Sequence, residues 1–139
     1  MSTIDDIRRR YEAGQLEDIR GDLERFLRAH GPRIACFKEE QRAKGVEVDD
    51  ELAVKLYLIH YRSINPRKEI QDQLEEIRKE AWIRGINTGC APDPQEVAQD
   101  WAKKYSAAWR DHRITTIVYV FERDKERYLR LLQSMTGGG

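Results

Sequence analysis

The sequence has few cysteines, few prolines and no long apolar run, and each shortage excludes a class of protein. Its two cysteines, Cys36 and Cys90, stand in no metal-ligand spacing, so neither a disulfide scaffold nor a cysteine-based metal site is expected. No apolar stretch approaches the roughly 20 residues that a membrane-spanning helix needs. The N-terminal residues also lack the apolar region of a signal peptide. We therefore expect a cytoplasmic protein with reduced thiols and no membrane partner.

The chain also lacks an excess of either charge. Lys and Arg together number 25, and Asp and Glu together number 25, so no net field draws the protein to nucleic acid or to anionic lipid. The distribution is uneven, because residues 101–139 carry 8 basic and 4 acidic side chains, a net of +4. Charged side chains make up 36% of the residues, which favours exposed helix faces over sheets.

The three histidines lie in no arrangement typical of catalysis or metal binding. His30 falls in the predicted last turn of a helix, where it suits the helix dipole. His60 falls in an apolar helix, which predicts a hydrogen-bonded core histidine. His112 follows Asp111, whose side chain leaves another face of a helix. Because a glycine-rich phosphate loop and local ligand clusters are also missing, we assign no catalytic, cofactor-binding or metal-binding residue.

The N-terminal third contains short amphipathic segments with recognisable helix ends. Thr3 begins the first predicted helix and Gly14 ends it. A second helix is predicted to end at Gly31 and Pro32, because glycine caps helices and proline breaks them. A third, short segment is predicted to end at Gly45.

Residues 50–64 form the most apolar of the predicted helices. Apolar side chains occupy its whole circumference, which is typical of a central, buried helix. At about 15 residues it is too short to span a membrane. Its apolar residues are Leu52, Ala53, Val54, Leu56, Tyr57, Leu58, Ile59, Tyr61 and Ile64.

Two later helices have clear starting signals. Asn65 followed by Pro66 predicts one start, and Gly85 is the predicted end of that helix. Asp93 followed by Pro94 predicts the next start, as part of a capping box.

Residues 95–135 contain no glycine or proline, and residues 114–121 within them are almost all β-branched or aromatic. A strand there would be apolar on both faces and would find no partner strand in the chain, so we predict a helix. A single helix over 94–134 would be roughly 60 Å long. A compact domain of this size has a radius of gyration of roughly 14 Å. We therefore expect a break near residues 111–113, or packing of the far half on a second chain.

The sequence as a whole predicts an all-α fold. We expect a compact bundle of five or six helices with a central apolar helix near 50–64 and a long, broken C-terminal helix. Residues 1–135 are expected to form a single domain and residues 136–139, which read TGGG, a disordered tail.

The function expected from these features is a non-enzymatic helical interaction or regulatory module that self-associates, most simply as a two-fold dimer. One alternative is an enzyme whose site is assembled from distant helices. The other alternative is a nucleic-acid-binding regulator that uses C-terminal basic residues. Its candidate contacts are Lys103, Lys104, Arg110 and Arg113. The candidate interface residues for self-association are Trp109, Ile117, Phe121, Tyr128 and Leu132.

Overall fold

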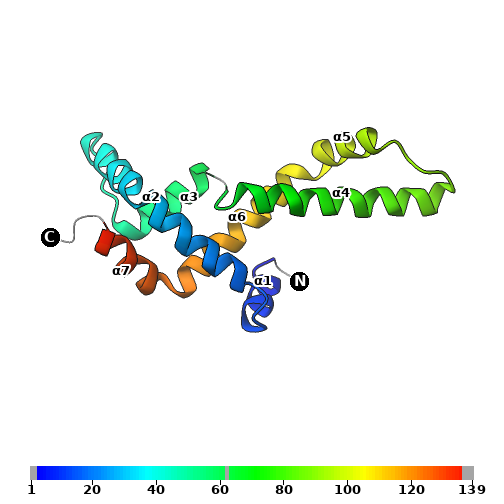
Figure 1. Cartoon of the computed structure of the whole chain (residues 1–139). Coiled ribbons are helices and arrows are strands. Elements are labelled where there is room, and N and C mark those ends of the chain that lie inside the picture. Colours follow the sequence, from blue (N-terminus) through cyan, green and yellow to red (C-terminus); the bar gives the residue numbers. More distant parts are fainter. Residues whose placement is uncertain (1–2, 62, 136–139) are drawn as a thin grey trace. The chain divides into compact units, whose positions relative to one another are not determined.

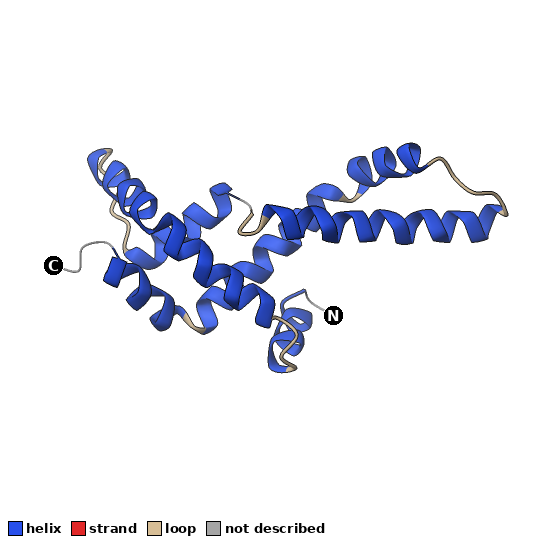
Figure 2. Cartoon of the chain, in the orientation of Figure 1, coloured by secondary structure: helices blue, strands red, loops and turns tan. Residues whose placement is uncertain are grey.

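Helices provide the regular structure of residues 3–61 and 63–135, which are the residues that the computed structural model describes. Figure 2 shows helices joined by loops, and this part of the chain contains no strand. The all-α prediction is confirmed. The predicted count of five or six helices is wrong, because these residues form seven helices. They are α1 (Thr3–Glu12), α2 (Glu17–Ala43), α3 (Asp50–Tyr61), α4 (Pro66–Thr88), α5 (Pro94–Lys104), α6 (Ser106–Arg123) and α7 (Lys125–Met135).

The helices belong to two compact units. Unit 1 comprises Met1–Ile64 and Arg113–Gly139, and it holds α1, α2, α3, α7 and the greater part of α6. Unit 2 comprises Asn65–His112 and holds α4, α5 and the first turns of α6. The single domain expected over residues 1–135 stays a prediction. The disordered tail expected over 136–139 lies outside the described residues.

The core of unit 1 forms where α2 packs against α3 and α7 and where α3 also packs against α7 (Figure 1). The rings of Phe121 on α6 and Tyr128 on α7 stack with their centroids 6.0 Å apart. Burial of these apolar side chains is the main favourable contribution to the stability of the unit. The buried cluster consists of Ile7, Leu16, Ile19, Leu23, Phe26, Leu27, Ile34, Ala53, Val54, Tyr57, Leu58, Ile117, Val120, Phe121, Tyr128 and Leu132.

The predicted end of a helix at Gly31 and Pro32 is wrong, because α2 continues through both residues to Ala43. Proline removes one helical hydrogen bond, but Leu27 before it and Ile34 after it are buried in the same core. Tertiary packing therefore overrides the local signal. Gly31 serves a different purpose, since a Cβ atom there would lie 2.5 Å from Cε of Met135 on α7.

Residues 114–121 are helical, as predicted, and lie within α6. The predicted long C-terminal helix with a break near 111–113 is wrong, because the chain leaves helical geometry at Tyr105 and at Asp124 instead. Beside Tyr105, the Ser106 hydroxyl donates to the carbonyl of Ala102, a local bond that competes with the helical ladder. Asp124 forms an ion pair with Arg20 of α2 at 2.8 Å. No glycine or proline stands at either break, so the sequence pattern did not predict them.

In unit 2, α4 and α5 run side by side (Figure 1). The predicted caps at their starts are confirmed. The Asn65 side chain accepts a hydrogen bond from the backbone N–H of Lys68, and Asp93 accepts one from the backbone N–H of Gln95. The predicted end at Gly85 is one turn too early, since α4 ends at Thr88 and is capped by Gly89, which has a φ of 72°. Only glycine adopts that backbone angle without strain.

A charged hydrogen bond joins α5 to α4, and α5 also buries two apolar side chains. Val97 and Trp101 of α5 are buried. Arg84 of α4 donates to Asp100 of α5 at 3.0 Å. No helix in the described part of the chain is both long and apolar enough to cross a membrane.

Candidate functional site

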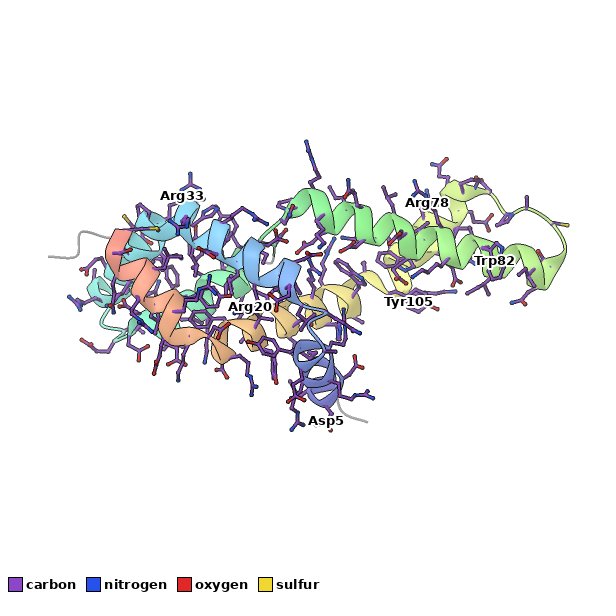
Figure 3. All side chains as sticks on the ribbon, turned by 60° about the horizontal axis from the view of Figure 1, so that its bottom comes forward. Asp5, Arg20, Arg33, Arg78, Trp82 and Tyr105 are labelled. Carbon is purple, nitrogen blue, oxygen red and sulfur yellow. The ribbon has the colours of Figure 1, made fainter. Side chains whose placement is uncertain are left out.

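A groove of about 580 Å³ lies within unit 1, between the second half of α2 and the C-terminal turns of α3. Its volume is in the range of small-molecule sites. We call it the α2–α3 groove. Figure 3 labels one of its residues, Arg33, on α2. Its walls are formed by Pro32, Arg33, Cys36, Phe37, Glu40 and Gln41 of α2, by the α2 C-cap Lys44, and by Tyr57, His60 and Tyr61 of α3.

The spacing of these residues explains why they share one groove. On α2 they recur at intervals of three and four, which places them along one face of a helix. On α3, Tyr57, His60 and Tyr61 repeat the same spacing. The face on α2 exists only because the helix continues past Pro32. Because the sequence predicted that the helix ends at Pro32, the groove could not be predicted.

A cluster of aromatic rings and His30 lies at the end of the groove near Arg33. The ring of His30 stacks on Phe26, with centroids 4.3 Å apart, and its Nδ1 lies 3.1 Å from the Tyr57 hydroxyl. The Tyr57 and Tyr61 rings stack with centroids 4.8 Å apart. Arg33 donates a hydrogen bond of 3.0 Å to the Tyr61 hydroxyl. Two helices, α2 and α3, thus bring together a histidine, two tyrosines and an arginine.

Burial and charge set the protonation of this cluster. Burial, followed by the effect of Tyr61, raises the pKa of Tyr57 to about 12. The pKa of Tyr61 is lowered, first by the neighbouring Tyr57 hydroxyl and then by Arg33. Burial, assisted by the charge of Arg33, lowers the pKa of His30. At neutral pH the cluster therefore contains a neutral histidine beside a positive guanidinium.

The charges around the groove are unevenly placed. Arg33 stands at the end where Tyr61 closes the wall, and Lys44 stands about 16 Å farther along α2 at 1.5 Å per residue. Glu40 is one helical turn from Lys44, and it is the groove's acidic side chain. The Arg33 end is therefore positive and aromatic, while the Lys44 end carries both signs.

Helix α3 has a second apolar face, on the side opposite its core face. Leu52, Leu56 and Ile59 recur at i, i+4 and i+7, and 42%, 37% and 47% of their respective surfaces are exposed. We call these three residues the α3 outer face. The predicted central helix is therefore covered on one side only. The buried side consists of Ala53, Val54, Tyr57 and Leu58.

Charged side chains border the α3 outer face. Lys55 lies 3.1 Å from Glu51 and also pairs with Glu122 of α6. Lys125 lies 3.6 Å from Glu51. The border thus carries two acids and two bases, which makes it nearly neutral and mixed in sign.

The structure places the predicted interface residues in two settings. Ile117, Phe121, Tyr128 and Leu132 are buried in the core of unit 1, where side chains of the same chain cover them. Trp109 is half-buried in unit 2. The width of the apolar stripe on α6 is thus accounted for within unit 1.

The predicted nucleic-acid contacts also divide between the units. Lys103, Lys104 and Arg110 are exposed in unit 2. Arg113 is half-buried in unit 1. Nucleic-acid binding by these residues stays a prediction.

Two histidine predictions are wrong. His60 is exposed on the wall of the groove, because the core side of α3 is the Ala53–Val54 side. His30 lies inside α2 rather than in its last turn, because the helix continues. The signal that could have indicated the cluster is the pair of aromatic i, i+4 spacings, Phe26 with His30 and Tyr57 with Tyr61.

Comparison of the chain with protein-family models, with curated proteins and with solved structures found no match. In residues 3–61 and 63–135, His, Cys, Asp and Glu side chains form no group of three suited to hold a metal ion. Both cysteines, Cys36 and Cys90, are free and exposed.

Proposed function

We propose that this chain is a non-enzymatic helical interaction module of the cytoplasm, and that it associates with a second copy of itself through the α3 outer face. The observation that carries the proposal is the row of Leu52, Leu56 and Ile59 on one side of a helix whose other side already forms a core. A helix apolar on both sides is typical of one that is packed between two layers.

Burial of these three side chains against a partner would stabilise the complex. Fully burying a leucine or isoleucine side chain contributes about 1.5–3 kcal/mol relative to leaving it exposed. Single exposed apolar residues are common on protein surfaces, but three in helical register form a contiguous patch. Such a patch supports a protein partner more readily than a solvent-facing role.

A second copy fits the border of the patch better than a strongly charged partner does. A two-fold interface places the same surface on both sides, so it must be complementary to itself. The border carries two acidic and two basic side chains, Glu51 and Glu122 with Lys55 and Lys125. The chain has a formal net charge of zero at pH 7, so two copies do not repel each other at long range.

The test is sedimentation velocity of the whole chain over a range of micromolar concentrations. We expect a dimer that Ile59→Glu converts to a folded monomer, because a buried carboxylate without a partner is costly. Ile4→Glu on α1 is the matched control, since Ile4 and Ile59 are both 47% exposed, and it should leave the dimer intact. A wild-type monomer at every concentration, or equal effects of the two changes, would contradict the proposal.

Nucleic-acid binding is the competing proposal, and its support is the exposure of Lys103, Lys104 and Arg110 in unit 2. Binding through them should weaken steeply with salt, because counterions are released from the nucleic acid. A salt-dependent mobility shift with duplex DNA or single-stranded RNA, lost in Lys103→Glu/Lys104→Glu, would favour it over self-association alone.

A further inference from the structure

We propose that the α2–α3 groove is a binding site for a small planar aromatic carboxylate, with its carboxylate at Arg33 and its rings along Phe37 and Tyr57. The proposal is independent of self-association, because the groove residues and the α3 outer face are different side chains. It rests on the volume of the groove, the aromatic character of its walls and the position of its charges.

The walls suit a flat apolar body. Phe37 is half-buried and Tyr57 is buried, and their rings approach edge to face with centroids 6.2 Å apart. Tyr61 stacks on Tyr57 and is more exposed, and both residues line the groove. Aromatic pairs prefer such stacked and edge contacts, and each contributes beyond simple area burial. The volume of about 580 Å³ accommodates two fused rings with solvent beside them.

The positive charge of Arg33 at one end of the groove favours a ligand that carries a carboxylate. The Arg33 guanidinium carries five N–H donors in a planar fork that matches a carboxylate, and one of these donors is used on Tyr61. The His60 ring, on the α3 wall of the groove, can donate a further hydrogen bond. Glu40 lies about 10 Å farther along α2, so its negative charge opposes a ligand at the Lys44 end more than at the Arg33 end.

The two cysteine thiols allow ligand binding to be measured, because one lies in the groove and the other lies outside it. Cys36 lines the groove and Cys90 belongs to unit 2, and both thiols are free and exposed. A ligand along Phe37 should shield Cys36 from an alkylating reagent and leave Cys90 unchanged. Each thiol is read separately by mass spectrometry of the digested protein.

The experiment titrates the whole chain with 2-naphthoate and with neutral 2-naphthamide, by calorimetry and by the rates of iodoacetamide alkylation. We expect saturable binding of 2-naphthoate with slower alkylation of Cys36 only. Binding of 2-naphthamide should be weaker by about tenfold or more, because it lacks the charge-assisted hydrogen bonds of the acid. Arg33→Gln should remove the preference for the acid, whereas Arg42→Gln, an exposed change on the same helix outside the groove, should keep it.

Three outcomes would overturn the proposal. The first is equal binding of acid and amide to the wild-type chain. The second is protection of both cysteines to the same extent, which would indicate non-specific adsorption. The third is an undiminished acid preference in Arg33→Gln. Arg33 is exposed, and circular dichroism checks that the variant keeps its helices.

Discussion

At the scale of single residues, the cluster around His30 couples burial to protonation. His30 packs between Phe26 and Tyr61, its Nδ1 faces the Tyr57 hydroxyl, and Arg33 is the nearby positive charge. Protonating this histidine in the folded chain would place a second positive charge beside Arg33 in a partly dry site. The fold therefore favours the neutral ring.

This preference predicts a pH dependence of stability. The pKa of His30 in the folded chain is lowered below its ordinary value of 6.5, so between those two values the unfolded chain binds more protons. The stabilising contribution is complete above pH 6.5 and is lost as the pH falls from there towards the folded pKa. His30→Gln keeps a hydrogen-bonding group but does not titrate in this range.

We expect urea unfolding to show that the wild-type chain loses more stability than His30→Gln between about pH 7.5 and about pH 5.5. His60 and His112 are present in both proteins and cancel in the comparison. A wild-type chain whose loss equals that of the variant would show that His30 has no lowered pKa.

At the scale of elements, the starts of helices were predictable because short polar signals determine them. Asn65 and Asp93 cap α4 and α5 as their side chains suggested, and the Asp49 carboxylate accepts a hydrogen bond from the backbone N–H of Leu52 at the start of α3. The ends and breaks were less predictable. Gly31 and Gly85 looked like helix ends but lie inside helices. A glycine needed for close packing has the same sequence signature as a glycine needed for a cap.

The packing at Gly31 yields a prediction about α7. A large side chain there would meet Met135 and Leu132, so Gly31→Leu should destabilise the chain by about 1–3 kcal/mol through overpacking. Gly21→Leu on the same helix is the control, since a Cβ atom there meets only the Arg25 side chain, at 3.5 Å or more. That change should be close to neutral in urea unfolding. Equal effects at the two glycines would show that α7 does not approach α2 as described.

The groove could not be predicted for a related reason. Its walls come from two helices, and its α2 wall requires that helix to pass Pro32. No local pattern reports which faces of two helices will meet. The apolar richness of α3 was visible in the sequence, but its division into a buried and an exposed face was set by where α2 and α7 pack.

At the scale of the whole molecule, some apolar surface of the described chain is left exposed, because no other part of the chain covers it. The stripe on α6 that suggested an interface lies in the core of unit 1, while the α3 outer face, which looked like core, stays exposed. The sequence therefore indicated correctly that apolar faces abound, but it could not assign them to inside or outside. That assignment depends on tertiary contacts between distant segments.

The central claim, that the α3 outer face is covered by a second copy, is tested most directly by amide hydrogen exchange at two protein concentrations. The concentrations should lie on either side of the dimer dissociation constant, about a hundredfold apart, so that mass action changes the assembly. We expect exchange in residues 50–61 to slow at the higher concentration, while residues 3–12 exchange at the same rate in both. Exchange in residues 50–61 that does not depend on concentration, in a sample that sedimentation shows to be dimeric at the higher one, would contradict the account.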